Sequence, residues 1–526
     1  MENFHRRPAP RNKTRRSSMD GFVANGAKTP NGSRKVGDFS QRDGLHQRSR
    51  RSMQQTRQPR RDDSGSIKLD MNLDNGAKKN QQRAKKRFSK WQMPRMRTMA
   101  LVFVIAFGSF LITSAYLKAR QVFQGGGGAV ALQDDVDPAR LNGEGDGRVN
   151  ILLLGTDDAA GLTDTIIIAS IDPIHDEAAL LSIPRDLYVE REGLGSMKIN
   201  EVFPNERNRA LANQATQRQA QIRGYRAVQD SVSEVAGIPM HYYASIDFDG
   251  FRRAIDTVGG VTLEVDQPVY EVLSLQGQRY VLNVQTGQEQ FDGLRALAYV
   301  RSRKTSPRGD FDRSERQREL LIALKDEIVS SGTWSNPARI NSLFSDFADN
   351  TETSFALEEI MRLREIADKI NTIESIELVG EEPKNFIISD MLGGLSIQRP
   401  RAGMYDYSEI QNYVRNTLRD GYLRSEDATV LVMNGTDQPY LAQKQTEELE
   451  SYGYTVATPQ ENSIPRQRET ILVDLTNGEK RYTKRYLEQR LKTFASTNLP
   501  RGVTVDNQQI DFVILIGDNE ITRLQN

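Results

Sequence analysis

One stretch of the chain concentrates five arginines and two aspartates just before a predicted helix: residues 296–317, ALAYVRSRKTSPRGDFDRSERQ. Asp312 and Glu315 form a capping-box pair, and apolar residues then recur at helical spacing, so the helix is expected to begin near Arg313. Counting back from the apolar stripe places Arg313 and Arg316 on or beside the face that looks into the protein. Arginines rarely lie on such a face without a partner.

These arginines have two interpretations. Arg301 and Arg303 are two positions apart, so on an extended segment both would point to the same side. The predicted helix N-terminus adds a partial positive charge, and planar guanidinium groups suit phosphate or pyrophosphate oxygens. This pattern predicts an anion pocket. The alternative is a structural network in which the arginines pair with nearby acidic residues.

Two aspartates and another arginine are predicted to meet at one edge of a sheet. The folded part opens with three short apolar runs that read as buried strands, at residues 149–154, 165–171 and 178–183. Their connections are too short for crossover helices, so the strands should form an antiparallel meander. Asp157 would then end the first strand, Asp164 would precede the second, and Arg185 would follow the third. A solvated rim is possible, but beside an anion pocket this arrangement suggests a divalent metal near a bound phosphate.

Composition excludes several kinds of chemistry. The 526 residues have room for two or three domains and contain no cysteine, which excludes disulfides, thiol nucleophiles and Cys-zinc sites. None of the four histidines lies near a serine in a nucleophile elbow. A Ser-His-Asp hydrolase and a His-ligated zinc site therefore have almost no support.

An uncharged segment predicts a membrane anchor. Residues 99–117, MALVFVIAFGSFLITSAYL, would span about 28 Å as a helix, enough for a bilayer core. Lysines and arginines crowd its upstream flank, so the positive-inside rule places the N-terminus in the cytoplasm and the later domains outside the cell. A cleaved signal peptide is the alternative, although its apolar core is normally shorter.

The regions on either side of the predicted span differ in charge. Residues 1–98 carry 26 Lys and Arg against 8 Asp and Glu, and the remainder carries 45 against 62. The basic tail lacks apolar periodicity, so it is expected to be disordered, with contacts to anionic lipid headgroups favoured over nucleic-acid binding. Residues 118–147, with four consecutive glycines and an acidic stretch, indicate a linker.

The remaining patterns predict a mixed α/β fold, with a central sheet flanked by helices. A mostly polar helical stretch covers residues 205–235, and further helices are expected near 354–370 and 406–417. We expect this domain to extend over residues 148–420. A small α/β domain should follow at 428–519, with alternating strands and helices.

Six ordered motifs resemble those of the LytR-CpsA-Psr family of cell-wall ligases. The motifs are Asn150-Ile-Leu-Leu-Leu-Gly-Thr-Asp157, Thr163-Asp164-Thr165, Ser182-Ile-Pro-Arg185-Asp186, Lys198-Ile-Asn200, Val258-Gly-Gly-Val261, and Ala298-Tyr-Val-Arg301-Ser-Arg303 continuing through Gly309-Asp310 to Arg313 and Gln317. The match covers roughly residues 148–330 and extends to about 420. Asn434-Gly435-Thr436 after the first strand of the last domain resembles the LytR C-terminal domain.

The resemblance implies an enzyme of cell-wall assembly. Such a phosphotransferase moves a glycopolymer, with its linking phosphate, from a polyprenyl-pyrophosphate carrier to peptidoglycan, assisted by Mg2+ or Mn2+. Asp157 and Asp164 resemble the metal-binding aspartates of the family. The residues that resemble its pyrophosphate-binding set are Arg185, Lys198, Arg301, Arg303, Arg313 and Gln317.

Two points stay open within this resemblance. Asp164 or Asp186 would orient or deprotonate the acceptor hydroxyl, with Arg185 beside them. Leu162 stands where the family usually has an arginine.

The alternative function is a non-catalytic, membrane-bound protein of the cell envelope that binds polyprenyl phosphate or has a regulatory role.

Overall fold

The computed structural model describes residues 128–157, 161–275, 277–304, 306–330, 350–380, 383–459, 464–505 and 509–525. The predicted tail at 1–98 and the predicted span at 99–117 lie outside these ranges. Among the described residues, none of the helices combines the length and the apolar character needed to cross a membrane.

A six-stranded mixed sheet forms the centre of the first folded region, in the order β11-β6-β1-β2-β3-β12. Its strands are β1 (Val149–Thr156), β2 (Thr163–Asp172), β3 (Glu177–Ser182), β6 (Tyr242–Asp247), β11 (Thr351–Thr353) and β12 (Thr372–Ile376). β1, β2 and β3 pair antiparallel in sequence order, which confirms the predicted meander. β6 runs parallel to β1, β12 runs parallel to β3, and β11 runs antiparallel to β6.

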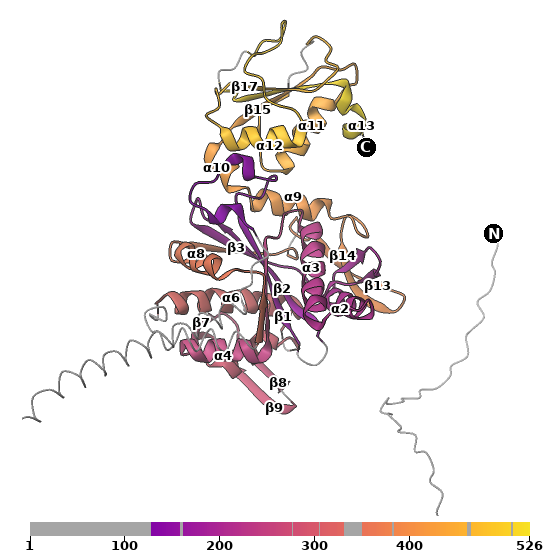
Figure 1. Cartoon of the computed structure of the whole chain (residues 1–526). Helices are drawn as coiled ribbons and strands as arrows, with labels where there is room; N and C mark the ends of the chain where they lie inside the picture. The colour runs from indigo at the N-terminus through magenta and orange to yellow at the C-terminus, as the bar shows by residue number, and fades with distance from the viewer. Residues whose placement is uncertain are drawn as a thin grey trace, which may run out of the picture. The chain divides into compact units, whose positions relative to one another are not determined.

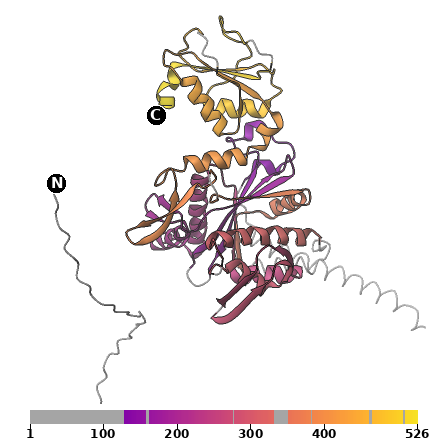
Figure 2. The ribbon, with the colours of Figure 1, turned by 180° about the vertical axis from the view of Figure 1, so that it is seen from behind.

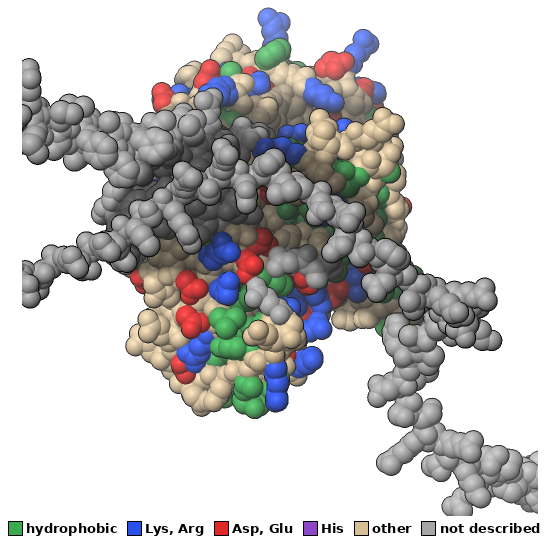
Figure 3. Space-filling model, turned by 60° about the horizontal axis from the view of Figure 1, so that its bottom comes forward, with side chains coloured by type: hydrophobic (Ala, Val, Ile, Leu, Met, Phe, Trp, Pro, Cys, Tyr) green, Lys and Arg blue, Asp and Glu red, His purple; other side chains and the backbone are tan. Residues whose placement is uncertain are grey.

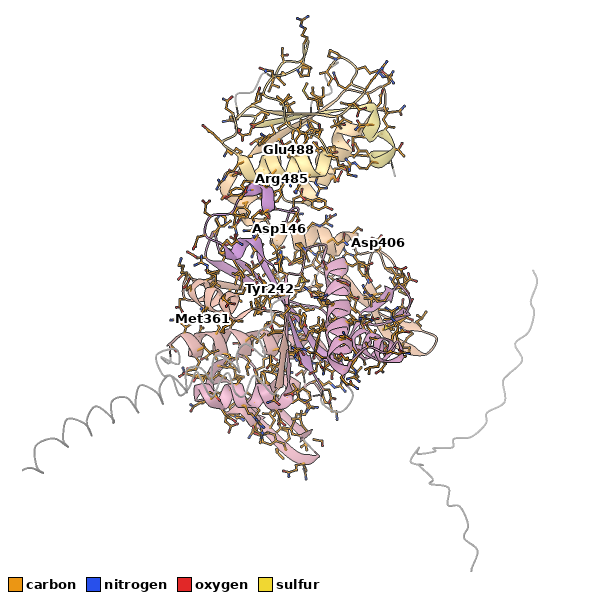
Figure 4. The ribbon with its side chains drawn as sticks, viewed as in Figure 1. Asp146, Tyr242, Met361, Asp406, Arg485 and Glu488 are labelled. Atoms are coloured by element: carbon orange, nitrogen blue, oxygen red, sulfur yellow. The ribbon has the colours of Figure 1, made fainter. Side chains whose placement is uncertain are left out.

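Helices cover both faces of this sheet (Figures 1 and 2). They are α3 (Gln217–Ala236) and α9 (Ser408–Thr417) on one face and α8 (Leu357–Ala367) on the other. Along β1, Leu152 and Leu154 pack toward α3, whereas Ile151 and Leu153 pack toward α8. Burial on both faces explains why the strands read as continuous apolar runs. On the α8 side, Tyr242 (Figure 4) donates a hydrogen bond of 2.7 Å to Glu359.

Short elements connect β3 to α3. They are β4 (Tyr188–Arg191), β5 (Gly195–Lys198), a 3₁₀ turn η3 (Ile199–Glu201) and α2 (Val202–Ala212). The helical stretch predicted at 205–235 is two helices rather than one. Thr216 accepts a hydrogen bond from the backbone N–H of Gln219 and so caps a new helix, α3.

The helices that carry the arginine-rich stretch pack with nearby strands into a separate apolar cluster. Its elements are α4 (Phe248–Val258), β7 (Val261–Val265), β8 (Val269–Leu275), β9 (Gln278–Val284), β10 (Gly287–Phe291), α5 (Gly293–Arg301) and α6 (Asp310–Ser330). A hairpin of β13 (Ile387–Leu392) and β14 (Leu395–Pro400) follows later in the chain. Arg318 of α6 donates hydrogen bonds to Ser182 at the end of β3, to Ser375 of β12 and to Glu377.

The last part of the chain forms a four-stranded sheet in the order β16-β15-β18-β17. Its elements are α10 (Gly421–Glu426), β15 (Thr429–Asn434), α11 (Leu441–Ser451), β16 (Thr455–Val456), β17 (Ile471–Asp474), α12 (Arg481–Leu491), β18 (Phe512–Ile516), the 3₁₀ turn η5 (Asp518–Glu520) and α13 (Ile521–Gln525). Apolar side chains of β15 alternate between two clusters, one on each face of the sheet. The predicted α/β class is therefore confirmed for both regions.

The segment predicted as a linker at 118–147 is packed where the structure describes it. It contains two 3₁₀ turns, η1 (Val130–Leu132) and η2 (Pro138–Arg140), and Val136 and Leu141 are buried against the C-terminal region. Glu144 accepts hydrogen bonds from Tyr454 and Arg490 at 2.6 and 2.8 Å. Its acidic residues therefore serve as interface partners, which composition alone could not indicate.

Candidate functional site

The ends of three central strands bring predicted site residues to one edge of the sheet. β1 ends at Thr156, β2 begins at Thr163 and β3 ends at Ser182, so Asp157, Asp164 and Arg185 lie at the same end of the meander. Arg185 Nη1 donates to Asp164 Oδ1 at 2.9 Å. The juxtaposition predicted from strand order is therefore present for Asp164 and Arg185.

The connection from β1 to β2 turns back on itself. The backbone N–H of Asp157 donates to the carbonyl of Leu162 at 3.0 Å, and that of Gly161 donates to the carbonyl of Asp157 at 2.9 Å. Gly161 has a φ of +65°, a conformation that favours glycine. These bonds hold both aspartates at the edge of the sheet.

Asp186 and Lys198 form an ion pair beside Arg185. Lys198 Nζ lies 2.7 Å from Asp186 Oδ1, and Arg185 Nε lies 3.7 Å from Asp186 Oδ2. The backbone N–H of Asn200 donates to the carbonyl of Arg185 at 3.2 Å, which fixes the β5 end against this segment. Asp186 is thus the counter-ion of two cations.

Asp310 connects three arginines that come from two distant parts of the chain. Its carboxylate lies 2.9 Å from Arg313 Nη1, 3.6 Å from Arg185 Nη2 and 3.9 Å from Arg303 Nη1. We call Arg185, Arg303, Asp310 and Arg313 the arginine cluster. The sequence motif contained Asp310, but nothing in the local pattern marked it as the residue around which the arginines gather.

The start of α6 differs from the prediction. The helix begins at Asp310, three residues before the predicted start at Arg313. Asp312 does not cap the helix, because its carboxylate accepts hydrogen bonds from the backbone N–H and the Nε of Arg308 at 3.0 and 2.7 Å. The predicted inward orientation of Arg313 is correct, since the residue is only 8% exposed.

Arg301 and Arg303 do not lie on an extended segment. Arg301 is the last residue of α5, and its guanidinium carbon lies 4.3 Å from the centre of the Phe248 ring. Gln317, also predicted at the site, donates to the carbonyl of Val300 at 3.2 Å. The alternation argument for these two arginines was therefore wrong, because a helix changes the direction of each side chain.

Other arginines of the same stretch have structural partners, and of the two described next only Arg308 forms the predicted ion pairs. Arg316 is buried and donates to the carbonyls of Tyr299 and Ser302 and to the hydroxyl of Ser306. Arg308 pairs with Asp312 and with Glu315. Some arginines of the stretch are thus structural partners, others converge on Asp310, and the anion pocket stays a prediction.

Hydrogen bonding within the arginine cluster is incomplete. Among the described residues, the buried Nε atoms of Arg185 and Arg313 have no hydrogen-bond partner. Asp310 Oδ1 lies at ion-pair distance from Arg313, yet it accepts no hydrogen bond from any described group, so the alignment is poor. Buried donors without partners are uncommon in proteins, and such donors are chemically suited to an anion.

Burial and neighbouring charges also shift the pKa values of two arginines in the arginine cluster. Burial lowers the pKa of the Arg313 guanidinium, and the neighbouring charges of Arg185 and Arg303 lower it further, against the opposing effect of Asp310. Burial also acts to lower the pKa of Arg185, but Asp164 and Asp310 outweigh it and the pKa is raised.

On the face shown in Figure 3, acidic and basic side chains are interspersed, so charge of one sign is concentrated only locally.

Glu271 of β8 holds the segment between α5 and α6 in place. Its buried carboxylate accepts hydrogen bonds from the backbone N–H groups of Arg303 and Lys304, at 2.8 and 3.0 Å. These bonds fix the chain between α5 and α6. No signal in the sequence could have found this contact, because Glu271 lies in an ordinary alternating strand.

The chemistry of the donor set fits a magnesium or manganese ion shared with substrate. Mg2+ is usually held by one or two carboxylates, with water and substrate phosphates completing its octahedral coordination. Asp157 and Asp164 supply two carboxylates at the same edge as the arginine cluster. The described residues contain no group of three or more acidic, His or Cys ligands, so these carboxylates do not form a complete protein cage.

Comparison with known proteins places the chain in a family. The LytR_cpsA_psr family model matches residues 116–409, and the LytR cell envelope-related transcriptional attenuator model matches residues 427–519. A curated relative, the polyisoprenyl-teichoic acid–peptidoglycan teichoic acid transferase TagU of Oceanobacillus iheyensis, is 32% identical over 47% of this chain and 74% of its own. The cell wall biosynthesis protein LcpA of Corynebacterium glutamicum is 31% identical over 43% of this chain, and the match spans about half (48%) of that relative.

A solved structure, that of B. subtilis TagV, is 28% identical, with a TM-score of 0.40 over 52% of this chain and 96% of that one. The family model covers more than half of the chain, including the strand ends, the Arg185 segment and the arginine-rich stretch. This chain therefore belongs to the LytR-CpsA-Psr family.

Proposed function

We propose that the protein is a phosphotransferase that attaches a glycopolymer from a polyprenyl-pyrophosphate carrier to peptidoglycan. The observation that carries the proposal is the arginine cluster, in which Arg185, Arg303 and Arg313 share one aspartate and buried Nε donors lack partners among the described residues. The name of the relative TagU, a teichoic acid transferase acting between a polyisoprenyl carrier and peptidoglycan, supports this substrate class.

The proposed reaction forms one bond and breaks one bond at phosphorus. An acceptor hydroxyl oxygen attacks the phosphorus that carries the sugar, and a new P–O bond forms. The P–O bond to the second phosphate breaks, so polyprenyl monophosphate leaves with the electron pair. The hydroxyl proton passes to a carboxylate, Asp164 or Asp186, and from there to solvent.

Different residues of the chain have different roles in the proposed reaction. Arg185, Arg303 and Arg313 neutralise the pyrophosphate oxygens, and their stabilisation is strongest as negative charge develops on the leaving phosphate. Arg185 also orients Asp164, its 2.9 Å partner. Asp157 and Asp164 would hold Mg2+ or Mn2+, which would supply Lewis-acid stabilisation of the phosphate. Lys198, Arg301 and Gln317 complete the proposed binding set.

The decisive experiment compares two arginines of the same stretch. Full-length protein in detergent is given a polyprenyl-pyrophosphate-linked oligosaccharide with a radiolabelled sugar and peptidoglycan fragments as acceptor. Arg313→Ala should lower transfer by about 100-fold or more, as loss of a charge-stabilising donor does. Arg308→Ala, which removes a surface arginine paired with Asp312 and Glu315, is the control and should transfer at the wild-type rate.

Other outcomes are equally informative. Donor binding that depends on Arg313, without any transfer to peptidoglycan, would favour the alternative function, a non-catalytic polyprenyl-phosphate binding or regulatory protein. Equal transfer by both variants would refute the assignment of the arginine cluster to pyrophosphate.

We also propose that residues 99–117 anchor the protein in the cell membrane, with the N-terminus in the cytoplasm and the later domains outside. The charge asymmetry around this segment supports the orientation. Protease added to intact cells without an outer barrier should digest the part after residue 117 and spare residues 1–98. Digestion confined to the N-terminal tail would reverse the orientation.

A further inference from the structure

Helix α2 follows directly after a turn that contacts the candidate site. The residues just before it, Ile199–Glu201, form the 3₁₀ turn η3. Within that turn, Asn200 donates its N–H to the carbonyl of Arg185 at 3.2 Å and accepts from the Thr163 hydroxyl at 3.4 Å. The start of α2 is therefore fixed both to the Arg185 segment and to the start of β2.

Arg207 of α2 lies beside Gly161, two residues before the start of β2. Its Nη1 is 3.7 Å from the position that a Cβ on Gly161 would occupy. Gly161 precedes Asp164 by three residues, a distance of at most about 10 Å along the chain. The guanidinium of Arg207 thus lies within reach of the same edge of the sheet as the arginine cluster.

The environment of Arg207 lacks the partners that an arginine normally has. Its guanidinium carbon lies 5.7 Å from the centre of the Phe203 ring. Its Nε is buried and has no hydrogen-bond partner in the described part of the chain, where Arg207 also forms no ion pair. By contrast, Arg209, two residues later on the same helix, pairs with Glu206 at 2.7 Å. A positioned cation without a carboxylate is suited to an anion that arrives with the substrate.

We propose that Arg207 is a further anion-binding residue of this site. Its guanidinium binds two non-bridging phosphate oxygens of the lipid-linked pyrophosphate from the side of Gly161. The proposal rests on the proposed function, because it assigns Arg207 to the same donor. It adds a cation from α2, a helix that none of the predicted site residues belongs to.

The test measures ligand binding rather than transfer alone. Full-length protein in detergent is titrated with inorganic pyrophosphate and with polyprenyl pyrophosphate, and binding is followed by calorimetry and by the shift in melting temperature. Arg207→Ala should weaken the affinity for both ligands about tenfold, as loss of one charge-assisted contact does. The empty variant should melt no lower than the wild type, because none of the described residues loses an ion pair with Arg207.

Three further variants keep the test decisive. Arg209→Ala is the matched control and should bind both ligands as the wild type does. Arg207→Lys should recover only part of the affinity, since an ammonium cannot make the two parallel hydrogen bonds of a guanidinium. If Arg207→Ala does not fold, Arg207→Gln keeps the Cβ–Cγ–Cδ stem and a polar end without the charge, and it should show the same loss of affinity.

The outcomes separate this proposal from the proposed function. If Arg313→Ala loses affinity and Arg207→Ala does not, only the assignment of Arg207 is wrong. If neither variant loses affinity, the pyrophosphate site itself is wrong. A lower melting temperature of empty Arg207→Ala, with the ligand shift unchanged, would show that Arg207 is a structural residue.

Discussion

The arginine cluster and a second cluster of arginine and aspartate in this molecule differ in how completely they are hydrogen-bonded. The second, which we call the junction cluster, consists of Arg148, Asp172, Asp420 and Arg424 and lies where the first folded region meets the C-terminal one. All three nitrogens of the Arg148 guanidinium donate, to the hydroxyl and the carbonyl of Ser170, to Asp172 and to the carbonyl of Arg419. In the arginine cluster, by contrast, the buried Nε atoms of Arg185 and Arg313 have no partner among the described residues.

The acidic residues show the same difference. Asp420 accepts five hydrogen bonds, from the N–H groups of Gly145, Gly147, Tyr422 and Leu423 and from the hydroxyl of Tyr486. Burial acts to raise its pKa, and the bonds from the backbone act to lower it. Asp310 Oδ1 is buried and accepts none from the described residues. A saturated charge cluster stabilises a fold, whereas an unsaturated one retains capacity for a ligand.

The largest effect on stability is expected in the junction cluster. Asp420→Ala leaves four backbone N–H groups and a tyrosine hydroxyl without their acceptor, and should reduce the free energy of unfolding by about 3 to 5 kcal/mol. Chemical denaturation of the purified full-length protein measures this. Ligand should not restore the loss, because Asp420 is not expected to contact substrate. A variant as stable as the wild type would contradict the view that the junction cluster stabilises the fold.

A large effect on transfer, with a small one on stability, is expected at the edge of the central sheet. Asp164→Ala should lower transfer by about 100-fold or more and weaken its dependence on Mg2+ or Mn2+, because it removes a proposed metal ligand. Asp157→Ala should behave similarly. The folded state should survive, since both residues lie at strand ends. Transfer at the wild-type rate with the same metal response would show that both aspartates are solvated residues at the edge of the sheet without a role in the reaction.

A smaller effect should follow from loosening the segment between α5 and α6. Glu271→Ala removes the acceptor of two backbone N–H groups, so Arg303 should be held less firmly, and affinity for pyrophosphate should fall about three- to tenfold. Glu271→Gln retains an oxygen that can accept both bonds and should recover most of the affinity. If Glu271→Gln binds as poorly as Glu271→Ala, the charge of Glu271 matters rather than its positioning of the backbone.

The smallest effect concerns acid stability at the junction. A hydrogen bond from Arg424 lowers the pKa of Glu177, against the effect of burial. A carboxyl with a lower pKa in the folded state stabilises the fold above its unfolded pKa, and this contribution disappears as the pH falls through the folded pKa. Glu177→Gln should therefore reduce stability by under about 1 kcal/mol at neutral pH and make no difference in acid. Melting curves of both proteins at pH 7 and in acid check this.

The sequence predicted the parts of the site that local patterns control. Three apolar runs with short connections could only form a meander, and the meander places Asp164 beside Arg185. The LytR-CpsA-Psr motifs then pointed to the arginine-rich stretch. Arg301 was misplaced because it is the last residue of α5 and does not lie on an extended segment.

Long-range contacts could not be predicted in this way. Glu271 and Arg303 are 32 positions apart, and no periodicity links a strand carboxylate to a distant backbone N–H. The cap assigned to Asp312 failed for a related reason, since Arg308 takes up its carboxylate. The assignment of roles within the site stays a prediction until the variants above are measured.

The hydrogen bonds of Arg318 have a mechanical consequence for the site. This buried guanidinium fastens α6, which carries Arg313, to the end of β3, which leads to Arg185, and to the neighbouring strand β12. Separating the two halves of the arginine cluster would therefore break three hydrogen bonds from a single buried cation. The spacing between Arg185 and Arg313 is thus set before any ligand arrives, so the anion meets a preorganised frame and does not have to assemble it.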